Sequence, residues 1–360
     1  MRRAASVALL LCAFAIPAFE FRALAQSGLR DRYFTRFPFD KWKTEGPVSQ
    51  IKWTSKVQPA RLSAHQRLLT RFELVLDRKE TEQRRGRGEL IIFVELTDSA
   101  NRRWRTHETF DFARLQGDAK AQQILYSQDA FILPGDYKLA LAICDSQTQE
   151  HSFIERPVHV APLHSEPLPD AWRDLPAVEF VRNFELPDNW YQPYMRGRVN
   201  VGIENHRPVH VDIVMNMTPS ERVAGSMRAF RRNMTILIPA LKVLSGISVP
   251  NGSLDVTLLD LTNHKTWEQH VAEQPGKQFN WSKFREPFAS NTPGIIDIQS
   301  LASKAEMLRF FRDEVSERLQ THGDKDQIRI VIVLSAPVFL EQQHKPDPTP
   351  LEKDPQRRLF

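Results

Sequence analysis

The sequence predicts an α+β multidomain protein in which an antiparallel β-sandwich is followed by an α/β domain. Three observations lead to this prediction. Residues 48–163 contain short alternating strands, residues 164–195 are rich in proline, and residues 196–344 combine strand patterns with long helical ones. The chain has 360 residues, 41% hydrophobic and 26% charged. This composition excludes a collagen-like, coiled-coil or wholly disordered chain, and the length allows each domain its own core.

The first 25 residues are predicted to be a signal peptide. Arg2 and Arg3 form a positive start, and residues 4–18 are apolar but too few to span a bilayer as a helix. Small residues at positions 23 and 25 place the cleavage between Ala25 and Gln26. The alternative is an uncleaved anchor. We expect an exported protein, periplasmic or extracellular, which is not an integral membrane protein after signal cleavage.

The charge of the mature chain does not indicate nucleic-acid binding. Removal of residues 1–25 leaves 46 basic and 43 acidic residues, a net charge of +3. Arginines cluster in three places without interleaved aromatic residues, which predicts solvated faces. These clusters are Arg84, Arg85 and Arg87; Arg102, Arg103 and Arg105; and Arg228, Arg231 and Arg232.

Cysteine usage excludes a disulfide framework. The chain has two cysteines, and Cys12 lies within the predicted signal peptide. Cys144, the one that remains, lies in an apolar strand pattern and is predicted to be a small buried hydrophobe.

Residues 26–163 are predicted to form an N-terminal arm, 26–47, and a sandwich, 48–163. The arm is aromatic and charged without clear periodicity. Strands are predicted around residues 71–77, 89–96, 103–106, 139–143 and 153–160. The tight turn from Leu133 to Tyr137, followed by an alternating strand, is typical of an immunoglobulin-like sandwich.

Residues 164–195 are predicted to be a semi-rigid connection because proline is frequent and glycine is not. The prolines of this region and its flanks are Pro162, Pro167, Pro169, Pro176, Pro187 and Pro193.

In residues 196–344, alternation predicts a hairpin over 199–215 and a strand over 253–261 paired with residues near Trp267. A helix is predicted from Thr218 to about Ser245, with Pro239 kinking or dividing it. A second helix is expected to begin with a capping box at Ser303. Its predicted apolar face consists of Leu308, Phe311, Val315 and Leu319. The run from Ile328 to Leu334 is typical of a strand buried on both faces, and residues 345–360 are predicted to be a polar tail.

The sequence contains no motif of a familiar reaction centre. It lacks a Gly-x-Ser-x-Gly elbow, a His-Glu-x-x-His helix and a glycine-rich phosphate loop. The closest histidine pairs in the second domain, His206 with His210 and His264 with His270, lack the spacing and added carboxylates of a metal site. We interpret these histidines as surface or turn residues.

One segment has the spacing of a ligand site. Asn216, Thr218 and Ser220 follow a predicted strand and precede a predicted helix, where open α/β sheets bind ligands. The spacing resembles the Asp-x-Ser-x-Ser loop of von Willebrand factor A domains, in which a carboxylate and two hydroxyls hold a divalent cation. In this resemblance Thr292 takes the place of that family's loop threonine.

Two departures from the family favour a structural interpretation. Asn216 stands where the family has aspartate, and Ser335 follows the last strand where the family usually has another. Neutral oxygens alone suit Mg²⁺ or Ca²⁺ poorly. The favoured interpretation is therefore a helix cap formed by Thr218 and Glu221, with no metal bound. Ligation of Mg²⁺ or Ca²⁺ is the alternative.

The order of elements resembles that of bacterial exported proteins with a von Willebrand factor A-related domain behind a β-sandwich. The residues that carry this resemblance are 133–139, 203–205, 208–213, 218–221 and 328–334. A full A domain continues with a further strand, helix and strand after Leu334. The sheet is therefore expected to be truncated or completed by another protein.

We expect a non-enzymatic, exported protein that binds a protein or a surface component of the envelope and needs no cofactor. Two alternatives remain open. The first is a divalent-cation-dependent adhesion module with ligands from Asn216, Thr218 and Ser220. The second is a hydrolase whose catalytic residues come together only in the fold.

Overall fold

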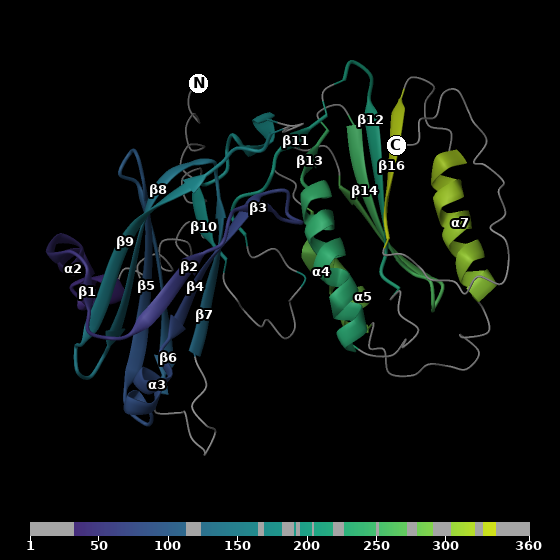
Figure 1. Cartoon of the computed structure of the whole chain (residues 1–360). Coiled ribbons are helices and arrows are strands. Elements are labelled where there is room, and N and C mark those ends of the chain that lie inside the picture. The colour runs from purple at the N-terminus through teal and green to yellow at the C-terminus, as the bar shows by residue number, and fades with distance from the viewer. Residues whose placement is uncertain are drawn as a thin grey trace, which may run out of the picture. The chain divides into compact units, whose positions relative to one another are not determined.

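The computed structural model in Figure 1 describes 11 stretches of the chain. They are residues 32–112, 124–164, 169–181, 191, 195–203, 205–218, 227–249, 252–271, 279–290, 304–320 and 327–335. The predicted signal peptide with its cleavage between Ala25 and Gln26, the candidate residues Ser220 and Thr292, and the predicted tail 345–360 lie outside these stretches. No helix in the described stretches is both long and apolar enough to cross a bilayer.

The chain forms two compact units of β-sheets and helices. The first comprises residues 1–62, 68–166 and 176–182, and the second comprises residues 63–67, 167–175 and 183–360. Antiparallel sheets dominate, together with several helices, which confirms the predicted α+β class.

The first unit contains two antiparallel sheets. One has the order β1 (Val48–Ser49), β9 (His151–Val160), β8 (Gly135–Asp145), β5 (Glu89–Asp98), β6 (Arg103–Asp111). The other has the order β10 (Val178–Phe180), β7 (Ile124–Ile132), β4 (Leu68–Leu76), β2 (Trp53–Val57), and β3 (Arg61–Leu62) also pairs with β4. The predicted turn at Leu133 is confirmed, and it carries the chain from β7 in one sheet to β8 in the other, with Gly135 at φ 152°.

The strand predictions for this unit are confirmed. In β4 the alternating residues Phe72, Leu74 and Leu76 are all buried, as expected of a strand with one face in a core. The turn after β5 also forms, with Asp98 Oδ1 accepting the backbone N–H groups of Ala100 and Arg102.

An aromatic segment covers one face of the first sheet. The helix α2 (Phe39–Glu45) begins with Phe39 and places Trp42 one turn later, and both side chains pack with Phe93 of β5 and Phe153 of β9. Phe39 meets Phe153 edge to face with the ring centroids 5.9 Å apart, and Trp42 meets Phe93 in the same way at 6.0 Å. Because this segment covers one side, β5 is buried on both faces.

A buried carboxylate joins α2 to the same sheet. Glu95 of β5 has no exposed side-chain surface, and its two oxygens accept hydrogen bonds from Lys43 and Arg105 at 2.6 Å each. Burial raises the pKa of Glu95, but the hydrogen bonds and charges of Lys43 and Arg105 outweigh it, so the pKa lies below its ordinary value.

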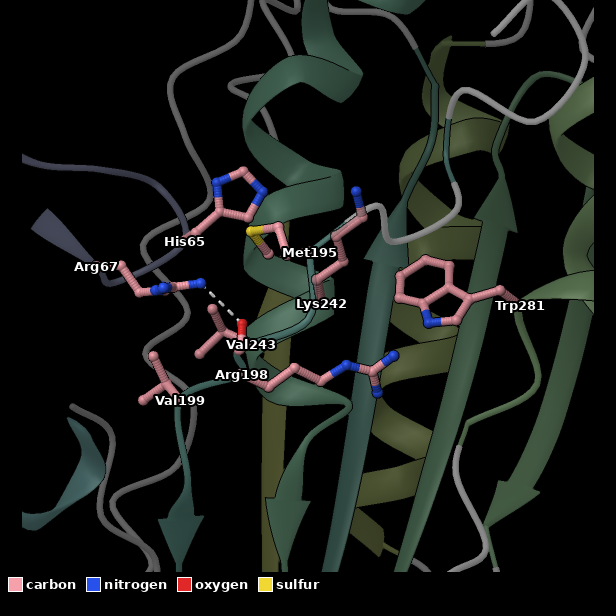
Figure 2. Close-up of a pocket in the computed structure, with 9 residues that line it drawn as sticks. His65, Arg67, Met195, Arg198, Val199, Lys242, Val243 and Trp281 are labelled. Carbon is pink, nitrogen blue, oxygen red and sulfur yellow. Dashed lines mark hydrogen bonds between the residues drawn. The ribbon is translucent and has the colours of Figure 1, made fainter. Parts of the chain in front are cut away.

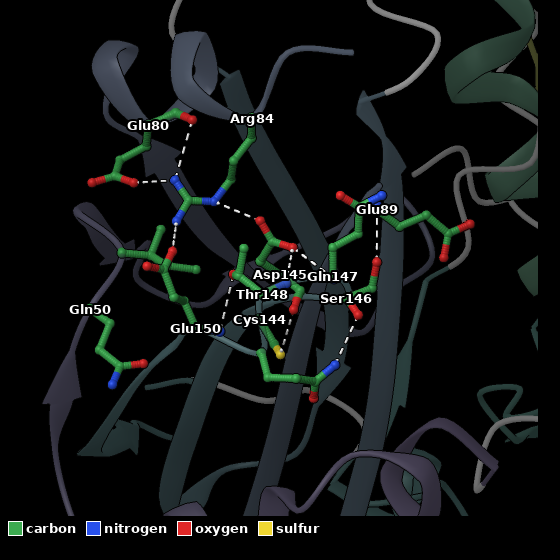
Figure 3. A network of polar contacts seen from close by, with 12 residues as sticks. Gln50, Glu80, Arg84, Glu89, Cys144, Asp145, Ser146, Gln147, Thr148 and Glu150 are labelled. Atoms are coloured by element: carbon green, nitrogen blue, oxygen red, sulfur yellow. Dashed lines mark hydrogen bonds and ion pairs between the residues drawn. The ribbon is translucent and has the colours of Figure 1, made fainter. Parts of the chain in front are cut away.

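A second ionic network corrects one sequence prediction (Figure 3). Arg84, expected on a solvated face, is buried at the end of α3 (Arg78–Arg84). It pairs with Glu80 on its own helix, with Asp145 of β8 at 3.1 Å and with Glu150 at 2.6 Å. Three carboxylates around one guanidinium make this arginine a structural residue.

Cys144 of β8 is buried, as predicted, in the cluster beneath α2. Burial, and secondly the neighbouring Asp145, raises the pKa of its thiol to about 12. The residue therefore behaves as a small hydrophobe and not as a nucleophile.

The predicted connection, residues 164–195, contributes structure to both units. A 3₁₀ helix, η2 (Pro169–Trp172), belongs to the second unit, whereas β10 pairs with β7 in the first. These residues therefore form more than a spacer.

The second unit is built on a four-stranded sheet. Its order is β15 (Lys265–Val271), β14 (Gly252–Asp260), β12 (Val209–Asn216), β16 (Ile328–Leu334). The strands β12, β14 and β16 are parallel, and β15 is antiparallel to β14, which confirms its predicted pairing.

The hairpin predicted over residues 199–215 is wrong. Its first arm is the short strand β11 (Val201–Gly202), which pairs in parallel with β13 (Ile247–Ser248), whereas its second arm is β12 in the larger sheet. Alternation identified both strands but carried no information about their partners.

One face of the four-stranded sheet is covered by α4 (Met227–Leu244), η3 (Trp281–Phe284) and α5 (Arg285–Ser290) (Figure 1). The side chains of α4 that face the sheet recur at helical spacing. They are Met234, Leu237, Ile238 and Leu241. The helix continues through Pro239, so this proline does not divide it, which was one of its two predicted effects.

The opposite face is covered by α7 (Lys304–Gln320) (Figure 1). The predicted apolar face of this helix is wrong at Leu308, which is 43% exposed. Met307, Phe310, Phe311 and Val315 instead pack on Val214, Leu259 and Leu261. The contact face is therefore rotated toward the side that carries Met307.

The strand β16 is less buried than its apolar sequence predicted. It pairs with β12 on one side and is the last strand of the sheet in the described stretches. Most of its residues are only half-buried, and Val333 is 41% exposed. The apolar run predicts a strand that is buried on both faces, but among the described residues β16 lies at the edge of its sheet.

We expect acid to destabilise the first unit through Glu95. Because its folded pKa is lowered, the stabilisation is present above the unfolded pKa and is lost as the pH falls through the folded pKa. At neutral pH, Glu95→Gln should cost about 3 kcal/mol, near the low end for a broken buried pair, because Lys43 and Arg105 keep some exposure. Urea denaturation between pH 3 and 7 measures both effects.

The matched control is Glu155→Gln, since Glu155 lies 3.9 Å from the same Lys43 but is 36% exposed. Its cost should stay below about 1 kcal/mol. Equal costs for the two variants, or an unchanged acid dependence in Glu95→Gln, would contradict the prediction.

Candidate functional site

The predicted ligand site lies where two parallel strands end side by side. Asn216 is the last residue of β12, and Ser335 directly follows β16. The Asn216 side chain is buried, and its Nδ2 donates to Ser335 Oγ at 3.0 Å. Its Oδ1 accepts the backbone N–H of Thr218 at 2.9 Å. The structure therefore brings together the two positions at which the sequence departs from the A-domain pattern.

Thr218 is oriented by a different contact from the one expected. Its hydroxyl accepts the backbone N–H of Leu261 at 2.8 Å, which ties the end of β12 to the end of β14. The described part of α4 begins at Met227. The rest of the predicted capping box, with Ser220 and Glu221, lies outside the described residues, as does Thr292.

The strand β14, which lies between β12 and β16 in the sequence, ends in a carboxylate that no sequence motif indicated. Asp260 is buried, and its Oδ1 accepts the backbone N–H groups of Thr262 and Asn263. Its Oδ2 accepts from the Asn263 amide at 2.6 Å. This carboxylate holds the turn into β15.

At the carboxyl ends of these strands, the side chains are those of Asn216, Thr218 and Ser335, which are all uncharged. Their oxygens and the Asn216 amide already form hydrogen bonds with one another or with the backbone. Such a set recognises polar groups of a partner more readily than it dehydrates a hard cation.

A second group of polar side chains lies near the opposite end of the same strands. His210 and Asp212 of β12 pair in register with Ser253 and Asp255 of β14. Alternate residues of a strand share a face, so these four side chains project to the same side of the sheet. We call them, together with His270 of β15, the His210 cluster.

The ring of His210 stands between a hydroxyl and two carboxylates. Its Nδ1 lies 2.5 Å from Ser253 Oγ. Its Nε2 lies 3.2 Å from Asp212 Oδ1 and 3.5 Å from Asp255 Oδ2. If the serine accepts the Nδ1 proton, the Nε2 lone pair faces two carboxylates, an arrangement that a bound cation or a second proton would stabilise.

Both carboxylates have further partners. Arg329 of β16 donates to Asp212 Oδ2 at 2.7 Å, and His270 contacts Asp255 Oδ1. The side chain of Asp212 is 5% exposed, whereas those of Asp255 and His270 are 34% and 60% exposed. The cluster is therefore anchored at Asp212 and open to solvent at Asp255.

This geometry permits two kinds of chemistry. A histidine nitrogen and two carboxylate oxygens within 4.8 Å of one another form a three-ligand set suited to Zn²⁺ or Mn²⁺. The order serine, histidine, aspartate is also that of a nucleophilic relay, although here the serine lies half-buried on a strand.

These histidines form two close pairs in the sequence and were predicted to be surface or turn residues. The structure instead brings one member of each pair, His210 and His270, to the same Asp255. The available signal was the i, i+2 spacing of His210 with Asp212 and of Ser253 with Asp255 on two predicted strands, since that spacing places each pair on one face.

Comparison with known proteins does not identify a family for this chain. No protein family and no curated protein match the chain. Two solved structures share a third of it. A structural-genomics target, SoR45, is 12% identical with a TM-score of 0.21, and the match covers 33% of this chain and 93% of that one. The crystal structure of an ApaA protein from Bordetella pertussis is 9% identical with a TM-score of 0.19, covering 33% and 100%.

We expect Asn216 to stabilise the ends of β12 and β16. Asn216→Ala removes a buried side chain and leaves the half-buried N–H of Thr218 without its acceptor, which should cost about 1–3 kcal/mol of unfolding free energy. Ser335→Ala removes only the exposed end of the same interaction and should cost less than about 1 kcal/mol. Urea denaturation of the full chain compares the two variants, and equal costs would contradict this role of Asn216.

Proposed function

We propose that this chain is an exported, non-enzymatic protein-binding protein in which an immunoglobulin-like β-sandwich precedes an A-like α/β domain. The observation that supports the proposal is the strand order of the four-stranded sheet in the second unit. Numbered by sequence, its strands run third, second, first, fourth, which is the order that begins a doubly wound sheet. Helices on both faces agree with this arrangement.

The first unit supports the sandwich. Four alternate residues of β5 that point away from α2 are all buried, as expected where a second sheet packs on the first. They are Leu90, Ile92, Val94 and Leu96. Export rests on the predicted signal peptide and its cleavage before Gln26.

In a doubly wound sheet, ligands bind at the carboxyl ends of the strands where the order reverses, here between β12 and β16. That position holds Asn216 and Ser335, both uncharged. The neighbouring Val333 is exposed on β16, which is the edge strand of the sheet among the described residues. An edge strand offers backbone groups for pairing with an extended segment of another protein. We therefore place the partner surface at Val333 and Ser335.

A crosslinking experiment tests this surface. A photoreactive amino acid at Val333 of the full chain should form an adduct with one discrete envelope protein. Excess unlabelled chain should suppress the adduct, and excess Val333→Lys chain should suppress it at least tenfold less effectively. The matched control is the same amino acid at Leu125, an aliphatic strand residue that is 62% exposed. The same adduct from Leu125, or equal competition by both chains, would refute the surface.

A second candidate function, cation-dependent binding, is favoured by the His210 cluster and not by the predicted ligands. His210, Asp212 and Asp255 supply the nitrogen and carboxylate oxygens that Asn216 and Thr218 lack. Ser253 would orient the ring through Nδ1, as outer partners do for metal-bound histidines.

Thermal unfolding in EDTA and then in Zn²⁺, Mn²⁺, Mg²⁺ or Ca²⁺ separates the candidates. An ion at 100 times its Kd stabilises the folded state by about 2.7 kcal/mol. If the His210 cluster binds, Zn²⁺ or Mn²⁺ should raise the Tm of the wild type and of Asn216→Ala but not of Asp255→Asn. A Mg²⁺ or Ca²⁺ shift lost in Asn216→Ala would instead restore the predicted site. No shift with any ion would eliminate this second candidate.

A further inference from the structure

Three side chains of the His210 cluster turn one ligand atom each toward the same space. Nε2 of His210 lies 3.2 Å from Asp212 Oδ1 and 3.5 Å from Asp255 Oδ2. Ligand atoms of the three residues all lie within 4.8 Å of one another. One nitrogen and two carboxylate oxygens therefore surround a space that adjoins two strands, β12 and β14.

The separations between these atoms fit a tetrahedral ion. Zn²⁺ in a tetrahedral site binds histidine nitrogen and carboxylate oxygen at about 2.0–2.2 Å, so neighbouring ligand atoms lie about 3.4 Å apart. The observed distances, 3.2 and 3.5 Å, lie on either side of that value. Octahedral Mg²⁺ at about 2.0–2.1 Å would place neighbouring ligands about 2.9 Å apart, and Mg²⁺ and Ca²⁺ both prefer oxygen ligands. Both the spacing and the histidine nitrogen therefore favour Zn²⁺.

The second polar atom of each of these side chains is held by an outer contact. The outer side chains come from β14, β16 and β15 in turn, and each lies on the same face of the sheet. The contacts join His210 Nδ1 to Ser253 Oγ at 2.5 Å, Asp212 Oδ2 to Arg329 Nε at 2.7 Å, and Asp255 Oδ1 to His270 Nδ1. Outer partners of this kind fix the tautomer and the orientation of metal ligands.

The cluster is enclosed on one side and accessible on the other. The side chains of Asp212 and His210 are 5% and 13% exposed, whereas that of Asp255 is 34% exposed. An ion can therefore enter from the side of Asp255. Within the described stretches the group has three members, so the fourth position of a tetrahedral ion is left for water.

The small pocket drawn in Figure 2 lacks such a set. Its lining includes one histidine, His65, and no aspartate, glutamate or cysteine. The convergence of nitrogen and carboxylate ligands in the His210 cluster is therefore not a general property of the polar sites in this unit.

We propose that the His210 cluster is a tetrahedral Zn²⁺ site with water in its fourth position, in which the outer contacts position the ligands. The proposal rests on the second candidate function above and adds to it the ion, the coordination geometry and the positioning residues. Because the ligands and their outer partners lie on all four strands of the sheet, one ion engages all four. The ligand atoms are His210 Nε2, Asp212 Oδ1 and Asp255 Oδ2.

Metal titration of the full chain, first treated with EDTA and then freed of it, tests the ion and its geometry. Zn²⁺ should bind at one ion per chain in competition with a chromogenic chelator, and Asp255→Asn should lose this binding. Co²⁺, which commonly replaces Zn²⁺, should give the intense visible absorption of tetrahedral Co²⁺ in the wild type and not in Asp255→Asn. The weak absorption of octahedral Co²⁺, or full Zn²⁺ binding by Asp255→Asn, would overturn the proposal.

Variants of the outer contacts test the positioning residues. Ser253→Ala and Arg329→Gln should each weaken Zn²⁺ binding by about 10–100-fold while leaving the three ligands in place. Ser253→Thr restores the hydroxyl and should bind Zn²⁺ like the wild type. The Tm of each variant in EDTA shows that it is folded. Unchanged Zn²⁺ affinity in Ser253→Ala and Arg329→Gln would refute the positioning role.

The matched control is His264→Ala, since His264 is an exposed histidine of the same unit that lies against Phe310. This variant should bind Zn²⁺ like the wild type, and loss of binding here would place the ion elsewhere. Absence of Zn²⁺ binding in the wild type would remove both this inference and the second candidate function. Unchanged affinity in the outer variants would remove this inference alone. The Val333 adduct, formed in EDTA, tests the leading function independently of either result.

Discussion

The second unit depends on the pairing of β12 with a parallel strand on each side. Both edges of this strand are hydrogen-bonded, to β14 and to β16, so its register with both neighbours is set. That register directs Val211, Ile213 and Met215 into the core beneath α4. It also directs the intervening residues toward α7. Both the His210 cluster and the Asn216 site follow from this alternation, one near each end of the strand.

Buried charges are paired in both units. In the first unit, buried acids and bases meet in closed networks, where Glu95 accepts from two cations and Arg84 pairs with three carboxylates. These networks join α2 and α3 to the sheet and leave little charge for a ligand. In the second unit, Arg318 of α7 likewise pairs with Glu314 on its own helix and with Glu268 of β15. Networks of this kind are structural because each charge already has its partner.

Much of the fold was predictable from local pattern, and the errors share one cause. Strands such as β4 and β14 and the helices α4 and α7 lie where periodicity placed them. The prediction of a hairpin over residues 199–215 was wrong because alternation identifies a strand but not the strand with which it pairs. The predicted contact face of α7 was wrong at Leu308 because Met307 and Leu308 are both apolar and fit the helical spacing almost equally well. Asn216 and Thr218 lie at the end of β12, as the sequence predicted, but the contacts that their side chains make were not visible in the spacing.

By itself, the sequence determined which segments are extended and which are helical, and that Cys144 would be buried, because these properties follow from a few neighbouring residues. Only the tertiary structure decided which side chains meet. His210 contacts Ser253 across 43 positions, and Asn216 contacts Ser335 across 119. Such contacts depend on strand order and register, which are set by the packing of the whole sheet and are not encoded in any local pattern.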